Sequence, residues 1–107
     1  MDFNHVTLIG QLVENPMSRE AGGQSQRATS FTLATSRAWI EGEARKEAVE
    51  LHTVEAWGKL AEIIGQYVKK GSKVYVEGRL RSRIVRGHRQ TEIVADNLIM
   101  LGHRHRS

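Results

Sequence analysis

The alternation of hydrophobic and polar positions along the chain predicts five β-strands. A strand is indicated where apolar side chains recur at every second position, or where β-branched residues dominate a short run. These stretches are residues 6–13, 28–37, 47–57, 73–84 and 90–100. In the third stretch, the odd positions from Val49 to Trp57 are predicted to share one face, because successive side chains of a strand point to opposite faces.

One stretch between the third and fourth strands has helical periodicity. Its apolar residues recur at intervals of one, three and four positions, and they are Leu60, Ile63, Ile64, Tyr67 and Val68. Gly71 follows two lysines, a pattern typical of a helix C-terminus. Phe31 lies on an alternating apolar face of the second strand and Tyr67 on the helical stripe, so both are predicted to be core residues.

The remaining segments are predicted to be turns and loops. Residues 14–27 contain the only proline and a Gly-Gly pair, so they are predicted to be mostly loop or a distorted strand. Residues 39–46 are predicted to form a polar hairpin tip that turns at Gly42, and residues 85–89 a second tip. Gly10 interrupts the first strand, which suggests a bulge or a sharp bend.

The order of these elements favours an all-β fold. Three strands, one short helix and two further strands match the five-stranded Greek-key OB barrel, with the helix between strands 3 and 4. Repeated βαβ units are excluded because only one connection is helical. The 107 residues fit one domain. We assign residues 1–102 to this domain and residues 103–107 to a short basic C-terminal end.

Composition narrows the class of protein further. Hydrophobic residues make up 39% and charged residues 26% of the chain, as in an ordinary soluble domain. The sequence shows neither an apolar run that would cross a membrane nor a signal-peptide pattern, so we expect a cytoplasmic protein without a membrane partner. The absence of cysteine excludes disulfides, thiolate nucleophiles and cysteine-ligated metals.

The positive charge is concentrated at one end of the sequence. The net charge is +4, and residues 78–107 alone carry seven arginines against two acidic residues. Such an asymmetry indicates an anionic partner, most commonly a nucleic acid. A solvated basic hairpin without a ligand would produce the same pattern.

Four stretches of the chain together form a specific sequence pattern. They read NHVTLIGQL followed by Asn15-Pro16, SFTLATSRAW, ELHTVEAWGKLAEIIGQYVKKGSKVYVEGRLRSR, and TEIVADNLIMLG. The third stretch combines a strand, the Gly58-Lys59-Leu60 helix start, a Lys-Lys-Gly-Ser helix stop and the next strand. In this order the stretches resemble the bacterial single-stranded-DNA-binding protein family along nearly the whole chain.

This resemblance implies an OB fold, no enzymatic activity and homo-oligomerisation, usually as a tetramer. It also implies that single-stranded DNA wraps over the barrels along aromatic and basic side chains. We expect nucleoid association and replication or repair proteins as further partners, and we predict no catalytic residue, metal or cofactor. By resemblance His52 lies near subunit contacts, and Val6 and Leu8 on the first strand are further interface candidates.

The predicted DNA-binding residues combine the resemblance with strand geometry. Trp39 and Trp57 match stacking aromatic positions of the family, and four cations match its basic positions. Three more arginines are added because they alternate with these on the fourth strand or cap its tip. The full set is Trp39, Trp57, Lys59, Lys70, Arg79, Arg81, Arg83, Arg86 and Arg89.

The chain also departs from the family pattern. Leu51 stands where the family has a stacking tryptophan, and Ile84-Val85 stand where it has another aromatic. The 107 residues do not include the family's glycine- and proline-rich tail with its acidic tip. Because guanidinium groups pair with phosphate and also stack on bases, we hypothesise that arginines replace the missing rings and make binding more sensitive to salt.

Other functions are less well supported by the residues. Gly58-Lys59 lacks the other residues of a phosphate-binding P-loop, and His103 and His105 alternate on a basic end without a clear metal set. The histidines, serines and glutamates form no nucleophile or acid pair. Two interpretations remain: a non-specific single-strand binder in replication, recombination and repair, or a primosome-like OB assembly module whose main partners are proteins. In the second, Trp39 and Trp57 would be structural.

Overall fold

Six strands and one helix make up the structure, a computed structural model that describes residues 1–21 and 26–102. In chain order the elements are β1 (Val6–Leu12), β2 (Met17–Ala21), β3 (Gln26–Glu41), β4 (Ala44–Trp57), α1 (Gly58–Tyr67), β5 (Lys73–Val85) and β6 (His88–Met100). The predicted strands and helix are confirmed. The predicted basic end at residues 103–107 lies outside the described residues.

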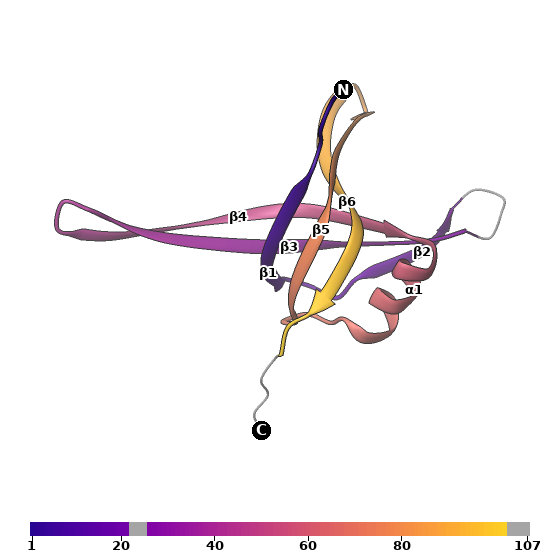
Figure 1. Ribbon diagram of the computed structural model, residues 1–107, viewed down its shortest axis with the longest axis horizontal. Helices are drawn as coiled ribbons and strands as arrows, with labels where there is room; N and C mark the ends of the chain where they lie inside the picture. The colour runs from indigo at the N-terminus through magenta and orange to yellow at the C-terminus, as the bar shows by residue number, and fades with distance from the viewer. Residues whose placement is uncertain (22–25, 103–107) are drawn as a thin grey trace.

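Five of the strands close into a barrel (Figure 1). The order around the wall is β1-β5-β6-β4-β3, and β3 returns to β1 through the pairs Gln11–Ala34 and Leu12–Leu33. All neighbours are antiparallel except β4 and β6, which run parallel over two residue pairs. This arrangement, with one helix between the third and fourth barrel strands, is the predicted OB barrel.

The side chains that fill the barrel interior come from every second residue of each strand. Leu33, Val54, Val74 and Val76 are almost completely buried, and Phe31 joins them as predicted. Helix α1 covers one end of the barrel with Ala61 and Ile64, and Val68 follows at its C-cap. Burial of this apolar surface is the main force that holds the strands together.

The prediction that Tyr67 is a core residue is wrong. Its side chain is 57% exposed. The helix has only ten residues and faces the barrel with the narrow stripe of Ala61, Ile64 and Val68. Tyr67 lies to one side of this stripe because each helical residue is rotated by about 100° from the previous one.

Two segments contain more strand than the sequence predicted. Residues 17–21, in a segment predicted as mostly loop or a distorted strand, form the regular strand β2 through antiparallel pairing with β3, from Met17 opposite Ser30 to Ala21 opposite Gln26. The β3–β4 hairpin turns at Gly42 as predicted, but both strands continue almost to that turn. The resulting ribbon extends well beyond the barrel (Figure 1).

Gly10 is required by a close approach of two strands. A Cβ atom at this position would lie 2.2 Å from the carbonyl oxygen of Ala34, which is far inside van der Waals contact. The missing side chain therefore lets β1 pass from its pairing with β5 to its short pairing with β3.

Candidate nucleic-acid interface

The β3–β4 pair has two faces, which the strand register identifies. Directly opposed residues of an antiparallel pair share a face. Val54 and Ala56 are fully buried and point into the barrel, so the alternate residues of β4 point outward. This outer face carries Val49, Leu51, Thr53, Glu55 and Trp57 on β4, which confirms that the odd positions share one face.

Trp57 lies at the barrel end of the outer face, where β4 ends and α1 begins. Arg19 of β2 is opposite Ala28 of β3, and Ala28 is opposite Trp57. Because Ala28 carries only a methyl group, the guanidinium of Arg19 reaches across it and lies 5.6 Å from the centre of the Trp57 ring. This distance allows a cation–π interaction.

Two glutamates and three arginines form a continuous network beside Trp57, which we call the arginine–glutamate cluster. Arg19 Nη2 donates to Glu55 Oε2 at 2.5 Å. Arg81 Nη2 donates to both Glu55 and Glu92, at 2.9 Å to Glu92 Oε1. Arg83 Nε donates to Glu92 Oε2 at 2.9 Å.

The carboxylates of this cluster are buried while its cations remain partly exposed. The side chains of Glu55 and Glu92 are 4% and 5% exposed, compared with 36% for Arg81. Burial of a carboxylate is unfavourable unless it is paired and hydrogen-bonded, and the three guanidiniums supply this pairing. The hydrogen bond to Glu92 raises the pKa of Arg81, burial opposes this, and Glu55 adds to it. Arg81 therefore stays charged.

The predicted arginine row on β5 lies on one face, but its members have carboxylate partners. Arg81 and Arg83 belong to the cluster, and Arg79 Nη1 donates to Asp96 Oδ1 at 2.8 Å. Both side chains of the Arg79–Asp96 pair are more than half exposed, so this ion pair contributes little to stability. The row therefore presents less free positive charge than its sequence indicates.

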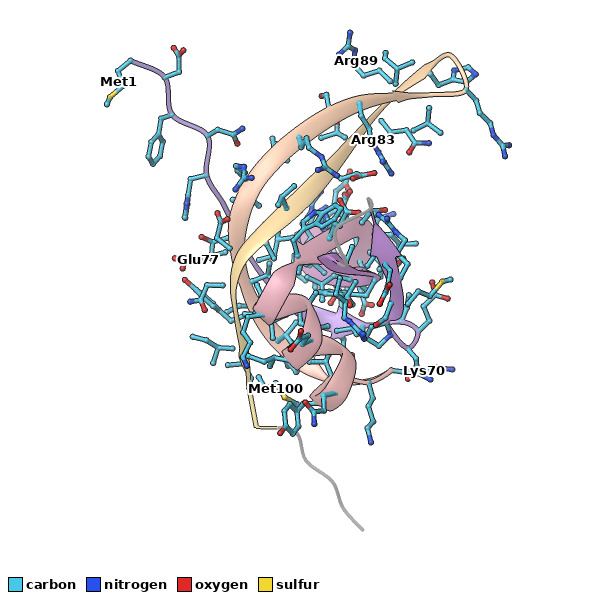
Figure 2. The ribbon with its side chains drawn as sticks, turned by 90° about the vertical axis from the view of Figure 1, so that its right-hand side faces the viewer. Met1, Lys70, Glu77, Arg83, Arg89 and Met100 are labelled. Carbon is cyan, nitrogen blue, oxygen red and sulfur yellow. The ribbon has the colours of Figure 1, made fainter. Side chains whose placement is uncertain are left out.

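The tip of the β5–β6 hairpin differs from the row. The chain turns at Arg86 and Gly87, both with positive φ, between Val85 and His88, which are paired. Arg86 and Arg89 are exposed there. Figure 2 shows Arg89 near this tip and Arg83 between the hairpin and the β3–β4 ribbon. The two tip arginines are exposed and lie outside the arginine–glutamate cluster.

Trp39 is far along the ribbon from Trp57. Trp39 is opposite Lys46, and it is an odd-numbered residue of β3 like the core residues Phe31 and Leu33. Trp57 is opposite Ala28, an even-numbered residue, so the register places Trp39 and Trp57 on opposite faces of the ribbon. The guanidinium of Arg37, two residues earlier on the same strand, lies 4.5 Å from the centre of its ring. The two predicted stacking residues thus belong to different surfaces of one subunit.

Lys59 and Lys70 lie apart from the arginine–glutamate cluster. Lys59 is exposed in the first turn of α1, and Lys70 is exposed just after the helix. The backbone N–H of Lys70 donates to Asn15 Oδ1 at 2.8 Å, which fixes the position of this loop. In Figure 2, Lys70 lies at the other end of the molecule from Arg89.

The residues predicted for the subunit interface, His52, Val6 and Leu8, are all partly buried within the subunit. His52 Nε2 lies 2.9 Å from Thr35 Oγ1 and is partly buried. Val6 and Leu8 are half-buried and pack against the core. The outward residue of β1 is Ile9, which is 52% exposed and forms one row with Tyr75 and Ile99 across β1, β5 and β6. The three interface residues stay a prediction.

Sequence reasoning missed Arg19, Glu55 and Glu92 as members of the site. Arg19 was in a segment predicted as mostly loop or a distorted strand, Glu55 was considered only as a possible member of an acid pair, and Glu92 only in the charge balance. The available signal was the position of Glu55 and Glu92 inside strands otherwise rich in apolar residues, in VEAW and TEIVA. An acidic residue in such a place needs a cation beside it.

The described residues show no other candidate chemistry that competes with this face. Within residues 1–21 and 26–102, no group of three or more histidine, aspartate or glutamate side chains is arranged to hold a metal ion. No helix in the same ranges has the length and apolar character needed to span a membrane.

Comparison with known proteins gives a consistent result. The chain is 45% identical over 108 residues to single-stranded DNA-binding protein 1 of Chlorobaculum tepidum, covering 94% of this chain. It is 40% identical over 110 residues to the single-stranded DNA-binding protein of Neisseria meningitidis, covering 97%. The chain spans 65% and 63% of the lengths of these two relatives.

Solved structures with the same fold support this relationship. A Plasmodium falciparum SSB in complex with ssDNA has a TM-score of 0.87 at 26% identity, covering 95% of this chain and 97% of that one. A deletion mutant of the single-stranded DNA binding protein from Thermus aquaticus has a TM-score of 0.84 at 28% identity, covering 95% and 52%. The model of the single-strand binding protein family matches residues 3–101. The chain therefore belongs to the single-strand binding protein family.

Proposed function

We propose that this protein binds single-stranded DNA with little regard to its sequence. Such binding needs cations along the path of the backbone and flat groups on which unpaired bases stack. The observation that carries the proposal is the outer face of β3–β4, where Trp57 lies beneath Arg19 and beside the arginine–glutamate cluster. In OB barrels this face, together with the loops beside it, is the usual site for oligonucleotides.

The structure supports a division of roles among the residues. Trp57 and Trp39 stack on bases, each contributing about 1–3 kcal/mol. Arg86, Arg89, Lys59 and Lys70 are exposed cations that attract the phosphates. The exposed side chain of Leu51 offers apolar contact in place of an aromatic ring. The protein is a binding protein rather than an enzyme, and it protects single strands in replication, recombination and repair, in the cytoplasm at the nucleoid.

We further propose that the protein assembles into a homo-oligomer, with four subunits as the expected number. Among the described residues, the backbone of residues 6–10 pairs only with β5, which leaves the other edge of β1 open to a second copy. The row of Ile9, Tyr75 and Ile99, in which Ile9 and Ile99 are exposed and Tyr75 is half-buried, lies on the same sheet. Several linked barrels would raise the affinity for a long strand through effective concentration.

The test is a titration of tryptophan fluorescence with oligothymidine at low and high salt, with a duplex of equal length as the control. We expect strong quenching by the single strand, weaker binding as salt rises, and much weaker binding of the duplex. Little quenching at low salt, or equal binding of both ligands, would contradict the proposal. It would favour the alternative of an OB assembly module whose main partners are proteins.

A further inference from the structure

The arginine–glutamate cluster places two carboxylates in the centre of a surface proposed to bind a polyanion. Glu55 and Glu92 point to the outer side of the barrel wall, where Glu92 is directly opposite Arg81 and Glu55 lies beside Val94. They are buried only because guanidiniums cover them. A carboxylate at this place repels phosphate, so attraction of the DNA backbone does not by itself explain why the surface contains carboxylates.

The two carboxylates change what the arginines can bind. Each guanidinium is planar, and its hydrogen bonds to a carboxylate lie in that plane. Arg19, Arg81 and Arg83 each have at least one edge bound to Glu55 or Glu92. The three guanidiniums and two carboxylates leave the cluster with a net charge of +1. A guanidinium that is partly exposed can still offer its planar face to a base while its edge is bound to a carboxylate.

The geometry at Trp57 fits this use. Glu55 holds Arg19 at the position where its guanidinium lies over the indole ring. The guanidinium therefore already lies over the ring at cation–π distance in the free protein, and a base can contact this pair without first ordering a long side chain. Loss of side-chain freedom is one of the main costs of binding, so this arrangement favours base contacts.

We propose that Glu55 and Glu92 are specificity-determining residues that make this cluster select unpaired bases over phosphates, and thus single strands over duplex DNA. A duplex presents its phosphates outward and stacks its bases inside, so it gains little from guanidinium faces, and the carboxylates reduce the positive charge that would attract its phosphates. This inference rests on the proposed function. It assigns the selectivity of the protein for single strands to two acidic residues that do not themselves attract DNA.

The experiment compares wild-type protein with Glu55→Gln, Glu92→Gln and the double variant. Anisotropy of labelled oligothymidine and of a labelled duplex of equal length gives both affinities over a range of salt concentrations. Glutamine keeps the size of the side chain and a hydrogen-bond acceptor while it removes the charge. Glu50→Gln is the matched control, because Glu50 is an exposed acid of the same strand on the opposite face.

We expect the double variant to bind the duplex about tenfold more tightly than wild type, while its affinity for the single strand changes by less than about threefold. The slope of log affinity against log salt for the duplex should steepen by about 0.9 for each additional phosphate contact. Glu50→Gln should leave the ratio of the two affinities unchanged.

One result would overturn the inference: a ratio of the two affinities that is the same in wild type and in all variants, whether because neither affinity changes or because both change equally. If Glu55→Gln does not fold, Glu92→Gln gives the same test, because Glu92 alone contacts both Arg81 and Arg83. Failure of wild-type protein to bind oligothymidine would refute the proposed function and with it the inference, whereas an unchanged ratio would refute only the inference.

Discussion

The two tryptophans of this protein each lie under an arginine, yet the two pairs are built differently. At Trp57 the arginine is Arg19, which comes from a different strand and is also bound to the buried carboxylate of Glu55. At Trp39 the arginine is Arg37, a neighbour on the same strand, on a ribbon that extends beyond the barrel. The first pair is part of the packing of the barrel, and the second is peripheral to it.

This difference separates the stability of the fold from the affinity for DNA, two properties that often depend on the same residues in binding proteins. At the barrel end, a change in the binding residues also changes the fold, because Glu55 and Glu92 need their cations. On the ribbon, Arg37 and Trp39 lie outside the arginine–glutamate cluster, so we expect a substitution there to change stability less than one at the barrel end. Paired variants at the two ends can therefore separate effects on stability from effects on affinity.

The largest expected effect is on stability, from Arg81→Ala at the barrel end. This change removes the cation shared by Glu55 and Glu92 and leaves each buried carboxylate with one partner. We expect the free energy of unfolding to fall by about 3 kcal/mol, the lower end for a broken buried pair because Arg81 is partly exposed. Chemical denaturation measures the change. Arg37→Ala is the control on the ribbon and should change stability by less than about 0.5 kcal/mol. Similar losses of stability in both variants would contradict the proposed difference between the barrel end and the ribbon.

The next effect is on affinity and compares Trp57→Ala with Trp39→Ala. If each ring stacks on a base, each variant loses about 1–3 kcal/mol of binding free energy, measured by anisotropy with labelled oligothymidine. Both rings are half-buried, but Trp57 lies against Arg19 of the arginine–glutamate cluster, so Trp57→Ala should lower the melting temperature more than Trp39→Ala. An unchanged affinity in Trp39→Ala would show that the ribbon tryptophan does not stack on DNA.

The smallest effect concerns the cations at the hairpin tip. Arg89→Ala removes an exposed guanidinium beyond the barrel. We expect the slope of log affinity for oligothymidine against log salt to become shallower by about 0.7, the value for one phosphate contact on a single strand. Arg81→Lys, which keeps the charge but lacks the planar group, should weaken binding without changing this slope. If Arg81→Lys made the slope shallower and Arg89→Ala did not, the phosphate contacts would belong to the arginine–glutamate cluster rather than to the hairpin tip.

The periodicity of the sequence was sufficient to predict most of the fold. Alternation reports which face of a strand is buried, and it identified the outward set of Glu55, Leu51 and Trp57 on β4. It could not predict β2, because residues 17–21 have no alternation of their own and become a strand only by pairing with β3. Local pattern likewise placed Tyr67 in the core, although only the packing of α1 decides which stripe is covered.

The aromatic members of the candidate site and its arginines on β5 were predictable from the sequence, but Arg19 and the two glutamates were not. Resemblance and strand parity identified Trp57, Arg81 and Arg83. The burial of Glu55 depends on β4 lying beside β6, and its partners come from β2 and β5. These contacts join four strands that are distant in sequence, so no local pattern reveals them. They also change the hypothesis of greater salt sensitivity, because paired arginines release fewer counterions than free ones.

The way the barrel closes also has a consequence for how the protein is made. Val6 of β1 pairs with Gly78 of β5, so β1 finds its main partner only after β5 has been synthesised. The hairpins β3–β4 and β5–β6 join neighbours and can form early, whereas closing a long loop has to precede any gain from β1. During synthesis the apolar side chains of β1 stay uncovered until β5 is available. We therefore expect β1 to be the last strand to join the barrel.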